Sequence, residues 1–419
     1  MEGIPYGRQY ITDEDIQSVV EVLKSDYLTQ GPKIQEFEEA FAKYVGSKYA
    51  VAVTNGTAAL HLCALSLEVK PGQKVITTPI TFAASANCIR YCGGEIVFAD
   101  IDPTTYLLDI NEVRKQLEAD DTKSIKGIIP VDFTGRSVNM EAYRSLANEF
   151  NCWIIEDACH APGASFVNSS DKEVKAGSGL YADLAIFSFH PVKHIATGEG
   201  GMVTTNTKEL YEKIKTLRTH GITKDKKQFL NPINMTGDYL EESFSNASYE
   251  YPYWYMEMQC LGYNYRISDI NCALGLSQLK RAEKGLIERM KIAVRYFEAF
   301  KSIPQITDYN NMFFSAQSQE GSEAISLSKH AYHLYVIEVP NRMQLYNHLR
   351  SKNIFTQVHY VPCHLMPYYQ SEGWGVGDMP NAESYYSRCI SLPMFPTLKI
   401  EEQEYVIDEI VEFFRKKSR

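Results

Sequence analysis

Short apolar runs alternate with helix-like patterns between Lys48 and about Leu217. Seven runs have the length and near-continuous hydrophobicity of strands buried on both faces of a sheet. They are "KYAVAV", "KVITTP", "EIVFAD", "IKGIIPVDF", "CWIIEDA", "LAIFSF" and "GGMVTTN". The pattern predicts an α/β fold in which helices cover both faces of a largely parallel sheet, giving a three-layer domain.

Helical patterns flank this region on both sides. Near the start of the chain, Thr12 can cap a helix with Asp15 at the third helical position, and apolar residues from Ile16 to Leu23 recur at helical spacing. We expect this helix to lie on a core. A long helical stretch is predicted from about Ser268 to Phe300.

The C-terminal part of the chain predicts a smaller α/β domain. Its strand and helix patterns are "HAYHLYVIEV", "MQLYNHLRSKN", "IFTQVHYVP" and an amphipathic helix from Glu401. We therefore divide the chain into a large domain at residues 1–267 and a small domain at 268–419, led by the long helix. Residues 221–255 of the large domain are polar and without period, as in a long functional or mobile loop.

Composition narrows the class of protein. The 419 residues include 44% hydrophobic and 22% charged residues, as in a globular protein, and no window is apolar enough to span a bilayer. The first residues carry no basic and apolar export signal, and the nine cysteines form no CxxC pair, so we expect a cytoplasmic protein without disulfides or zinc. The net charge of −10 argues against nucleic acid as a partner but leaves a local basic pocket for a phosphorylated ligand possible.

Candidate chemistry follows three of the predicted strands. In such a domain, ligands bind at the carboxyl ends of parallel strands. Gly56 and Thr57 open a helix after the first strand, where free N–H groups favour an anion. Asp157 ends a buried strand and needs a cationic partner, while Ser188 and Lys193 follow another strand. Each has an ordinary alternative: a plain turn, a structural ion pair or a solvated lysine.

Together these residues match the requirements of pyridoxal 5′-phosphate. A lysine forms the Schiff base, a carboxylate keeps the pyridine nitrogen protonated, and a cradle of N–H and hydroxyl groups takes the phosphate. Phe82, in "PITFAASAN", offers a flat ring on which the cofactor can stack, although core packing is the ordinary explanation for such a residue.

Four motifs carry a specific resemblance. The pattern S-F-x-x-x-K-x-x-x-x-G-E-G-G from Ser188 to Gly201, with "NGTAALHL", "EDACHAPGA" and "LGYNYRISDINCALG", resembles the DegT/DnrJ/EryC1/StrS sugar aminotransferases over nearly the whole chain. The resemblance implies the aspartate aminotransferase-like fold of type I pyridoxal phosphate enzymes. Residues 310–326 and the 221–255 loop look longer than in typical members.

The resemblance also implies a role for individual residues. Lys193 would carry the cofactor as an aldimine and move protons, Asp157 would face the pyridine nitrogen, and Phe82 would stack on the ring. His160 would stand near the phenolic oxygen, where relatives often have Gln. The implied phosphate ligands are Gly56, Thr57, Ser188 and, from a second subunit of a homodimer, Asn264. Implied substrate-binding residues are Tyr6, Arg266, His359 and Tyr360.

The implied reaction moves an amino group from L-glutamate, through pyridoxamine phosphate, to a nucleotide-linked keto sugar. Lys193 stands where a dehydrating branch of the family has histidine, so transamination is favoured. "IPYGRQYI", "FHPVKHIATGEGG" and "VHYVPCHLMPYY" are most similar to the pseudaminic acid branch, which aminates C4 of a UDP-linked 4-keto-6-deoxy-N-acetylhexosamine. A GDP- or dTDP-linked acceptor and a non-catalytic, cofactor-binding regulator remain alternatives. His359 and His364 lack a nearby carboxylate in the sequence, so we expect no metal site.

Overall fold

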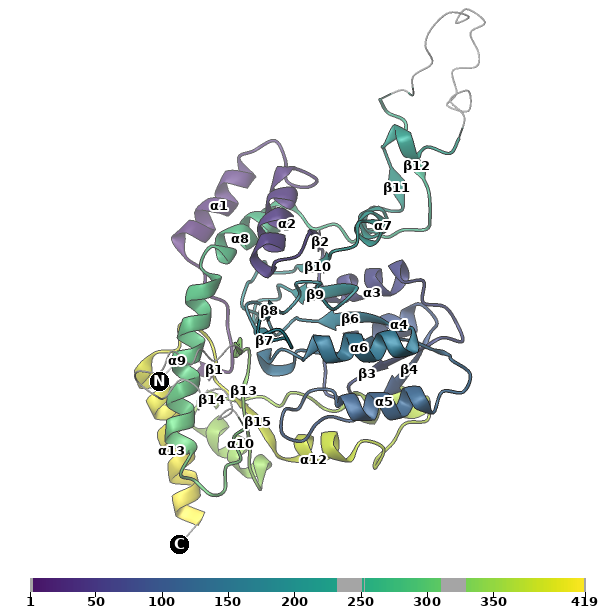
Figure 1. The fold of residues 1–419 in the computed structure, drawn as a ribbon. Helices are drawn as coiled ribbons and strands as arrows, with labels where there is room; N and C mark the ends of the chain where they lie inside the picture. Colours follow the sequence, from purple (N-terminus) through teal and green to yellow (C-terminus); the bar gives the residue numbers. More distant parts are fainter. Residues whose placement is uncertain (1–2, 232–250, 252, 310–328, 418–419) are drawn as a thin grey trace, which may run out of the picture.

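The computed structural model describes residues 3–231, 251, 253–309 and 329–417. The 310–326 stretch and most of the predicted 221–255 loop lie outside these residues. The described chain forms a three-layer α/β unit beside a smaller unit made by both ends of the sequence (Figure 1).

A seven-stranded mixed sheet forms the middle layer of the larger unit. Its order is β2-β10-β9-β6-β5-β3-β4, and every strand is parallel to the others except β10. The strands are β2 (Tyr49–Val53), β3 (Lys74–Thr77), β4 (Glu95–Phe98), β5 (Ile125–Ile129), β6 (Trp153–Asp157), β9 (Leu184–Ser188) and β10 (Gly201–Thr205). All seven coincide with the predicted apolar runs, so the prediction of a largely parallel sheet is confirmed.

Helices pack on both faces of this sheet because successive strand residues point to opposite sides. Val75 of β3 packs in the core under α3 (Gly56–Ser66), α4 (Ala84–Tyr91) and α7 (Lys208–Arg218). The next residue, Ile76, packs in the opposite core with α5 (Ile110–Glu118) and α6 (Met140–Phe150). Helix α2 (Pro32–Val45) covers β2 and β9 through Phe37 and Phe41.

The first helix, α1 (Asp13–Leu23), begins as predicted but faces differently. Thr12 and Asp15 form the expected reciprocal capping box. The expected apolar face is wrong: Ile16 and Leu23 are 54% and 56% exposed, whereas Val22 is buried. Helix α1 packs on α8 (Asp269–Leu279), and the buried Asp15 carboxylate sets its rotation by pairing with Arg281.

The long helix predicted from 268 to 300 is in fact two helices. Helix α8 ends at Leu279, and α9 begins at Ala282 and runs to Phe300. The break lies at Lys280 and Arg281, where the Arg281 guanidinium turns to Asp15 and to the Tyr10 carbonyl oxygen, 2.5 Å away. The break thus coincides with a side-chain pairing between distant segments, which the local pattern does not reveal.

The smaller unit has its own hydrophobic core. Its elements are β1 (Ile4–Pro5), α9, β13 (Tyr335–Glu338), α10 (Arg342–Ser351), β14 (Ile354–Phe355), β15 (Cys389–Leu392) and α13 (Ile400–Lys417). Strand β1 pairs with β14, so Ile4 lies in this C-terminal core. The division of the chain at residue 267 stays a prediction.

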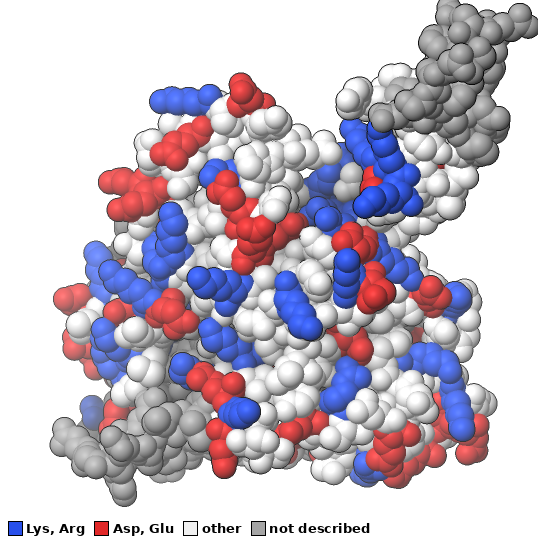
Figure 2. Space-filling view, turned by 45° about the horizontal axis from the view of Figure 1, so that its top comes forward, with Lys and Arg blue, Asp and Glu red and all other residues white. Residues whose placement is uncertain are grey.

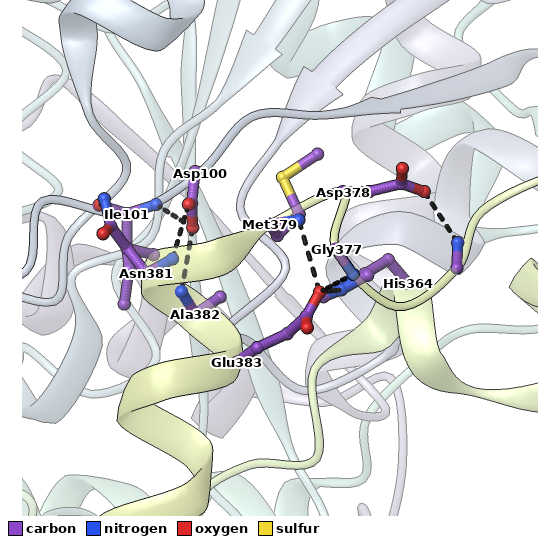
Figure 3. A network of polar contacts seen from close by, with 10 residues as sticks. Asp100, Ile101, His364, Gly377, Asp378, Met379, Asn381, Ala382 and Glu383 are labelled. Carbon is purple, nitrogen blue, oxygen red and sulfur yellow. Dashed lines mark hydrogen bonds and ion pairs between the residues drawn. The ribbon is translucent and has the colours of Figure 1, made fainter.

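A polar network holds helix α12 (Pro380–Arg388) against the sheet (Figure 3). The Asp100 carboxylate follows β4 and accepts from the backbone N–H groups of Asn381 and Ala382, at 2.8 and 2.9 Å. Glu383 accepts from His364 at 3.0 Å. Helix α12 in turn holds the chain at His359, since the Tyr385 hydroxyl donates to the His359 carbonyl oxygen at 2.8 Å.

The remaining elements are short. They are the hairpin β7 (Ser165–Val167) and β8 (Glu173–Lys175), the pair β11 (Ile222–Thr223) and β12 (Glu257–Met258), helix α11 (Pro367–Ser371) and 3₁₀ turns at 133–135, 226–228 and 363–365. Acidic and basic side chains are interspersed over the face in Figure 2, with several Lys and Arg gathered at its upper right. Within the described ranges, no helix combines the length and hydrophobicity needed to cross a membrane.

Candidate active site

A cavity of about 440 Å³ opens where strands β2, β6 and β9 end. Registers Asp157↔Ile186, Gly201↔Ser188 and Gly201↔Val53 bring these strand ends to one edge of the sheet. The cavity collects most of the residues singled out in the sequence: Tyr6, Gly56, Thr57, Phe82, Asp157, His160, Ser188, Lys193, His359 and Tyr360.

Asp157 is a buried carboxylate held from two sides. Its Oδ2 accepts from the Ser85 hydroxyl at 2.7 Å, and its Oδ1 accepts from the Cys159 backbone N–H at 3.2 Å. These bonds fix the carboxylate at the floor of the cavity while the exposed fraction of the residue is only 5%.

Two further carboxyl groups lie behind Asp157. Burial raises the pKa of Glu156 to about 7, and burial followed by the charge of Glu156 raises the pKa of Asp132. Backbone N–H groups of Gly177 and Val138 donate to them at 3.1 and 2.8 Å. The pair is therefore best described as sharing one proton, because two adjacent buried carboxylates repel each other.

Lys193 reaches the same cavity from the segment after β9. Its Nζ lies 3.5 Å from His333 Nε2, and burial lowers the pKa of the amine. A lysine in this state can act as a base, because part of its population is neutral at lower pH than for a solvated amine.

Imidazole rings line the wall beside Lys193. The His160 and His333 ring centroids are 4.2 Å apart, and His160 Nε2 lies 3.3 Å from the Tyr360 hydroxyl. Burial, followed by the charge of Lys193, lowers the pKa of both imidazoles well below the ordinary value. Both rings are therefore neutral, so one nitrogen of each can accept a hydrogen bond.

Gly135 permits this close approach of the two histidines. Its φ is +101°, and a Cβ there would lie 2.9 Å from the His160 carbonyl oxygen and 3.0 Å from the His333 backbone nitrogen. Any larger residue at this position would be strained in its backbone and would also push the two segments apart.

The start of helix α3 forms one end of the cavity. The Asn55 side chain accepts from the Ala58 N–H at 2.8 Å, so the N–H groups of Gly56 and Thr57 stand at the open helix end. A Cβ on Gly56 would lie 3.1 Å from Ser188 Cβ, inside the space between these two elements. Helix dipole, N–H groups and hydroxyl together suit a phosphate.

Phe82 and the residues after β14 form another part of the wall. Phe82 is 64% exposed although it lines the cavity, so its ring offers free apolar surface there. Tyr360 contacts it edge-on, with ring centroids 6.4 Å apart. His359 Nδ1 lies 2.8 Å from the Ser391 hydroxyl, and burial lowers the pKa of this imidazole to about 3.

Two predicted residues lie elsewhere in the described chain. Neither Asn264 nor Arg266 lines this cavity. Arg266 lines a separate hollow of about 550 Å³ between α2 and α7, and Asn264 forms an isolated bridge with Thr219. Within one copy, as far as it is described, these two residues are separated from Lys193 and Asp157.

The sequence analysis missed several residues of the site. Ser85, Cys159 and His333 line the cavity, and the first and last contact Asp157 and Lys193. Ser85 lies one helical turn after Phe82, which was a usable signal. His333 precedes a strand of the smaller unit, so only the packing of the two units brings it to Lys193.

Comparison with known proteins identifies the family. The model of the DegT/DnrJ/EryC1/StrS aminotransferase family matches residues 9–411. The chain is 38% identical over 416 residues to the spore coat polysaccharide biosynthesis protein SpsC of Bacillus subtilis, covering 97% of this chain and 96% of that protein. It is 35% identical over 418 residues to a UDP-4-amino-4,6-dideoxy-N-acetyl-beta-L-altrosamine transaminase of Campylobacter jejuni, covering 99% and 98%.

Comparison with solved structures supports the same family assignment. PseC of Helicobacter pylori, an aminotransferase involved in the biosynthesis of pseudoaminic acid, matches with a TM-score of 0.81 and 30% identity over 99% of this chain and all of that one. The PLP form of the sugar aminotransferase Spr1654 of Streptococcus pneumoniae matches with a TM-score of 0.82 and 26% identity over 99% of both chains, and a PMP form of it also matches. The chain therefore belongs to the DegT/DnrJ/EryC1/StrS aminotransferase family and is a sugar aminotransferase.

Proposed function

We propose that this chain is a pyridoxal phosphate-dependent enzyme that moves the amino group of L-glutamate to C4 of a UDP-linked 4-keto-6-deoxy-N-acetylhexosamine. The observation that carries the proposal is the meeting of a buried amine, Lys193, and a buried carboxylate, Asp157, in one cavity of about 440 Å³. The reaction would serve pseudaminic acid or a related surface glycan.

The residues present fit the cofactor. The open start of α3 and Ser188 would hold its phosphate, and the space that a Gly56 Cβ would fill favours glycine there. The exposed face of Phe82 would stack on its ring, and Asp157 would keep its ring nitrogen protonated. The His160 Nδ1 atom is buried without a hydrogen-bond partner, so this imidazole has an unused polar atom at the site.

The side chains would divide the proton chemistry between them. When bound, pyridoxal phosphate supplies an electron sink for the carbon from which a proton is removed. Lys193 Nζ would take that proton from the α-carbon of L-glutamate and return it to the cofactor carbon that carries the transferred nitrogen. The amine can do so because burial lowers the pKa of Lys193 and keeps part of its population neutral. His333 Nε2, 3.5 Å away, would orient the amine.

A homodimer would complete the site. Asn264 and Arg266 belong to the motif but do not line the cavity of their own copy. We propose that each reaches the cavity of a second copy, Asn264 toward the phosphate and Arg266 toward the substrate. The exposed apolar residues Tyr10, Ile16, Leu23, Tyr27 and Leu28 would suit burial between copies.

The acceptor sugar is proposed from the relatives and from the cavity wall. The transaminase from Campylobacter jejuni is named for a UDP-linked amino sugar. Tyr6, His359 and Tyr360 line the cavity beyond the cofactor residues and would contact the sugar. The identity of 38% to SpsC favours, as a second candidate, another nucleotide-linked keto sugar of a surface polysaccharide.

The test is a panel of acceptors. The cofactor-loaded protein is first treated with L-glutamate, which should bleach the visible absorption of the bound cofactor and release 2-oxoglutarate. UDP-, GDP- and dTDP-linked 4-keto-6-deoxy sugars are then added separately. Recovery of the absorption with the UDP-linked N-acetylated sugar alone supports the proposal, whereas recovery only with GDP or dTDP sugars would overturn the acceptor.

A further inference from the structure

A second cavity, of about 190 Å³, lies beside Lys193, and five Lys or Arg residues but only one acidic residue line it. Lys193 lines both this cavity and the larger one. The other charged residues around it are Arg8, Arg281, Lys284, Glu288 and Arg289. They come from the N-terminal segment, from the break between α8 and α9, and from α9 itself.

Two of these charges are already compensated. The Arg281 guanidinium pairs with the Asp15 carboxylate, and the Glu288 carboxylate pairs with Lys291 at 2.9 Å. Arg8, Lys284 and Arg289 have no carboxylate partner among the residues that the structure describes. The cavity thus carries an excess of positive charge.

Arg289 contributes to this excess of positive charge although its side chain is buried. It is 1% exposed, and its Nη1 donates to the carbonyl oxygens of Tyr332, His333 and Met394 at 3.0, 3.3 and 3.0 Å. All three acceptors are neutral, and its Nε has no acceptor. Burial lowers the pKa of Arg289 to about 10, with no carboxylate to offset the effect. A buried cation without a counter-charge is costly, so a mobile anion would stabilise it.

The rim of the cavity offers two more cations. Arg8 is exposed and lies over the Phe395 ring, with its Cζ 5.1 Å from the ring centroid. Lys284 is exposed one turn before Glu288. Both can approach an anion that has entered the cavity, because long cationic side chains keep their head groups mobile.

Volume limits the ligand. A cavity of 190 Å³ corresponds to roughly six water molecules at about 30 Å³ each. This space accommodates a small dicarboxylate or a phosphate ion but not a nucleotide. We propose that this cavity is a binding site for a small oxyanion, separate from the phosphate cradle at α3, and that Arg289, Arg8 and Lys284 are its cationic residues.

The test measures anion binding directly. Malonate and inorganic phosphate are titrated separately by calorimetry, at low ionic strength, into protein saturated with pyridoxal phosphate. The decisive variant is Arg8→Gln/Lys284→Gln, which leaves the buried Arg289 and its three hydrogen bonds intact. Lys208→Gln/Lys280→Gln, which removes two exposed charges outside this cavity, is the matched control.

We expect at least one of the two anions to bind the wild type and the control alike, and to bind the double variant about tenfold more weakly. The stronger of the two anions tells whether carboxylate or phosphate is preferred. The proposal is overturned if neither anion binds the wild type, or if the double variant binds as tightly as the control. Because the readout is binding, it does not depend on amine transfer, and failure of the proposed reaction would leave the result interpretable.

Discussion

At the scale of single residues, the site rests on a buried carboxyl group and a buried amine that their neighbours hold in place. Asp157 is held by Ser85 and the Cys159 N–H, and Lys193 lies beside neutral imidazoles. An anionic group is thereby fixed at the cavity floor and a partly neutral amine at its wall. This separation of charge allows one side chain to stabilise a cation while the other moves a proton.

The Asp157 carboxylate should be essential for amine transfer, and the hydrogen bond from Ser85 should contribute a smaller part of the rate. Asp157→Asn removes the negative charge and should lower kcat at least about a hundredfold. Ser85→Ala removes one hydrogen bond to a charged group and should cost about tenfold. Ser66→Ala, which removes a buried hydroxyl bonded only to the Cys63 carbonyl oxygen in α3, is the control and should change little. Steady-state kinetics of amine transfer would contradict the assignment if Asp157→Asn kept near wild-type kcat.

His333 should act by orienting Lys193. His333→Phe removes the acceptor 3.5 Å from Lys193 Nζ and should lower kcat about tenfold, with a smaller change in KM. His333→Gln keeps an acceptor oxygen and should recover part of the loss. An equal loss of kcat in both variants would show that His333 acts only through packing. An unchanged kcat in both variants would show that His333 does not orient Lys193.

The sequence was informative at this scale where a residue follows a strand directly. Asp157 and Ser188 end β6 and β9, and Lys193 lies five residues further on, so the rule that ligands bind at strand ends finds them. His333 and Cys159 were not assigned, although Cys159 follows the end of β6 by two residues and its place there was a usable signal. The position of His333 depends on long-range packing and on the tight backbone crossing at Gly135.

At the scale of elements, apolar runs predicted all seven strands of the large sheet, because a strand buried on both faces leaves a continuous signal. Orientation and continuity of helices were less predictable. The Asp15–Arg281 ion pair joins the buried face of α1 to the break between α8 and α9 at residues 280–281. Such pairs join segments far apart in the sequence and leave no periodic trace.

Asp100 should hold α12 and, through it, the cavity wall. Asp100→Ala leaves the backbone N–H groups of Asn381 and Ala382 without their acceptor (Figure 3). We expect a loss of about 1–3 kcal/mol in the free energy of unfolding, measured by urea denaturation. Because Tyr385 of α12 holds the His359 carbonyl oxygen, KM for the sugar should also rise.

Asp102→Ala is the control for this change. Asp102 lies two residues further along and accepts from the Thr104 N–H, the Thr104 hydroxyl and the Thr105 N–H at 2.9, 2.7 and 2.7 Å, all within its own turn and none from α12. Asp102→Ala should lower the free energy of unfolding less than Asp100→Ala does. Equal losses of this free energy in the two variants would contradict the anchoring role of Asp100.

At the scale of the whole molecule, stability should fall in mild acid. Burial lowers the pKa values of His160, His194, His330, His333 and His359 in the folded protein. The unfolded chain takes up protons near pH 6.5 while the folded protein does not, so each group costs up to about 1.4 kcal/mol per pH unit below that value.

The carboxyl pair Asp132 and Glu156 acts in the opposite direction, since its folded form retains a proton that the unfolded chain loses. This pair accounts for one proton, whereas five imidazoles act in the destabilising direction on acidification. The urea midpoint should therefore fall between about pH 7.5 and 5.5. A constant or rising midpoint on acidification would contradict the neutral, buried state of the histidines.

The whole molecule also determines what one copy can supply. Ten residues assigned from the sequence meet in a single cavity, but Asn264 and Arg266 remain apart from it. The family resemblance of the sequence already implied that Asn264 comes from a second subunit. The proposed second copy explains why Asn264 and Arg266 belong to the family motif although they do not line the cavity of their own chain.

The measurement that tests the central claim most directly is the location of the cofactor. The protein is incubated with pyridoxal phosphate, reduced with borohydride, digested and analysed by peptide mass spectrometry, with Lys193→Ala as a parallel sample. We predict that the mass of one reduced cofactor is found on the peptide carrying Lys193, and on no peptide of the variant. Cofactor attached to another lysine, or to none, would contradict the account.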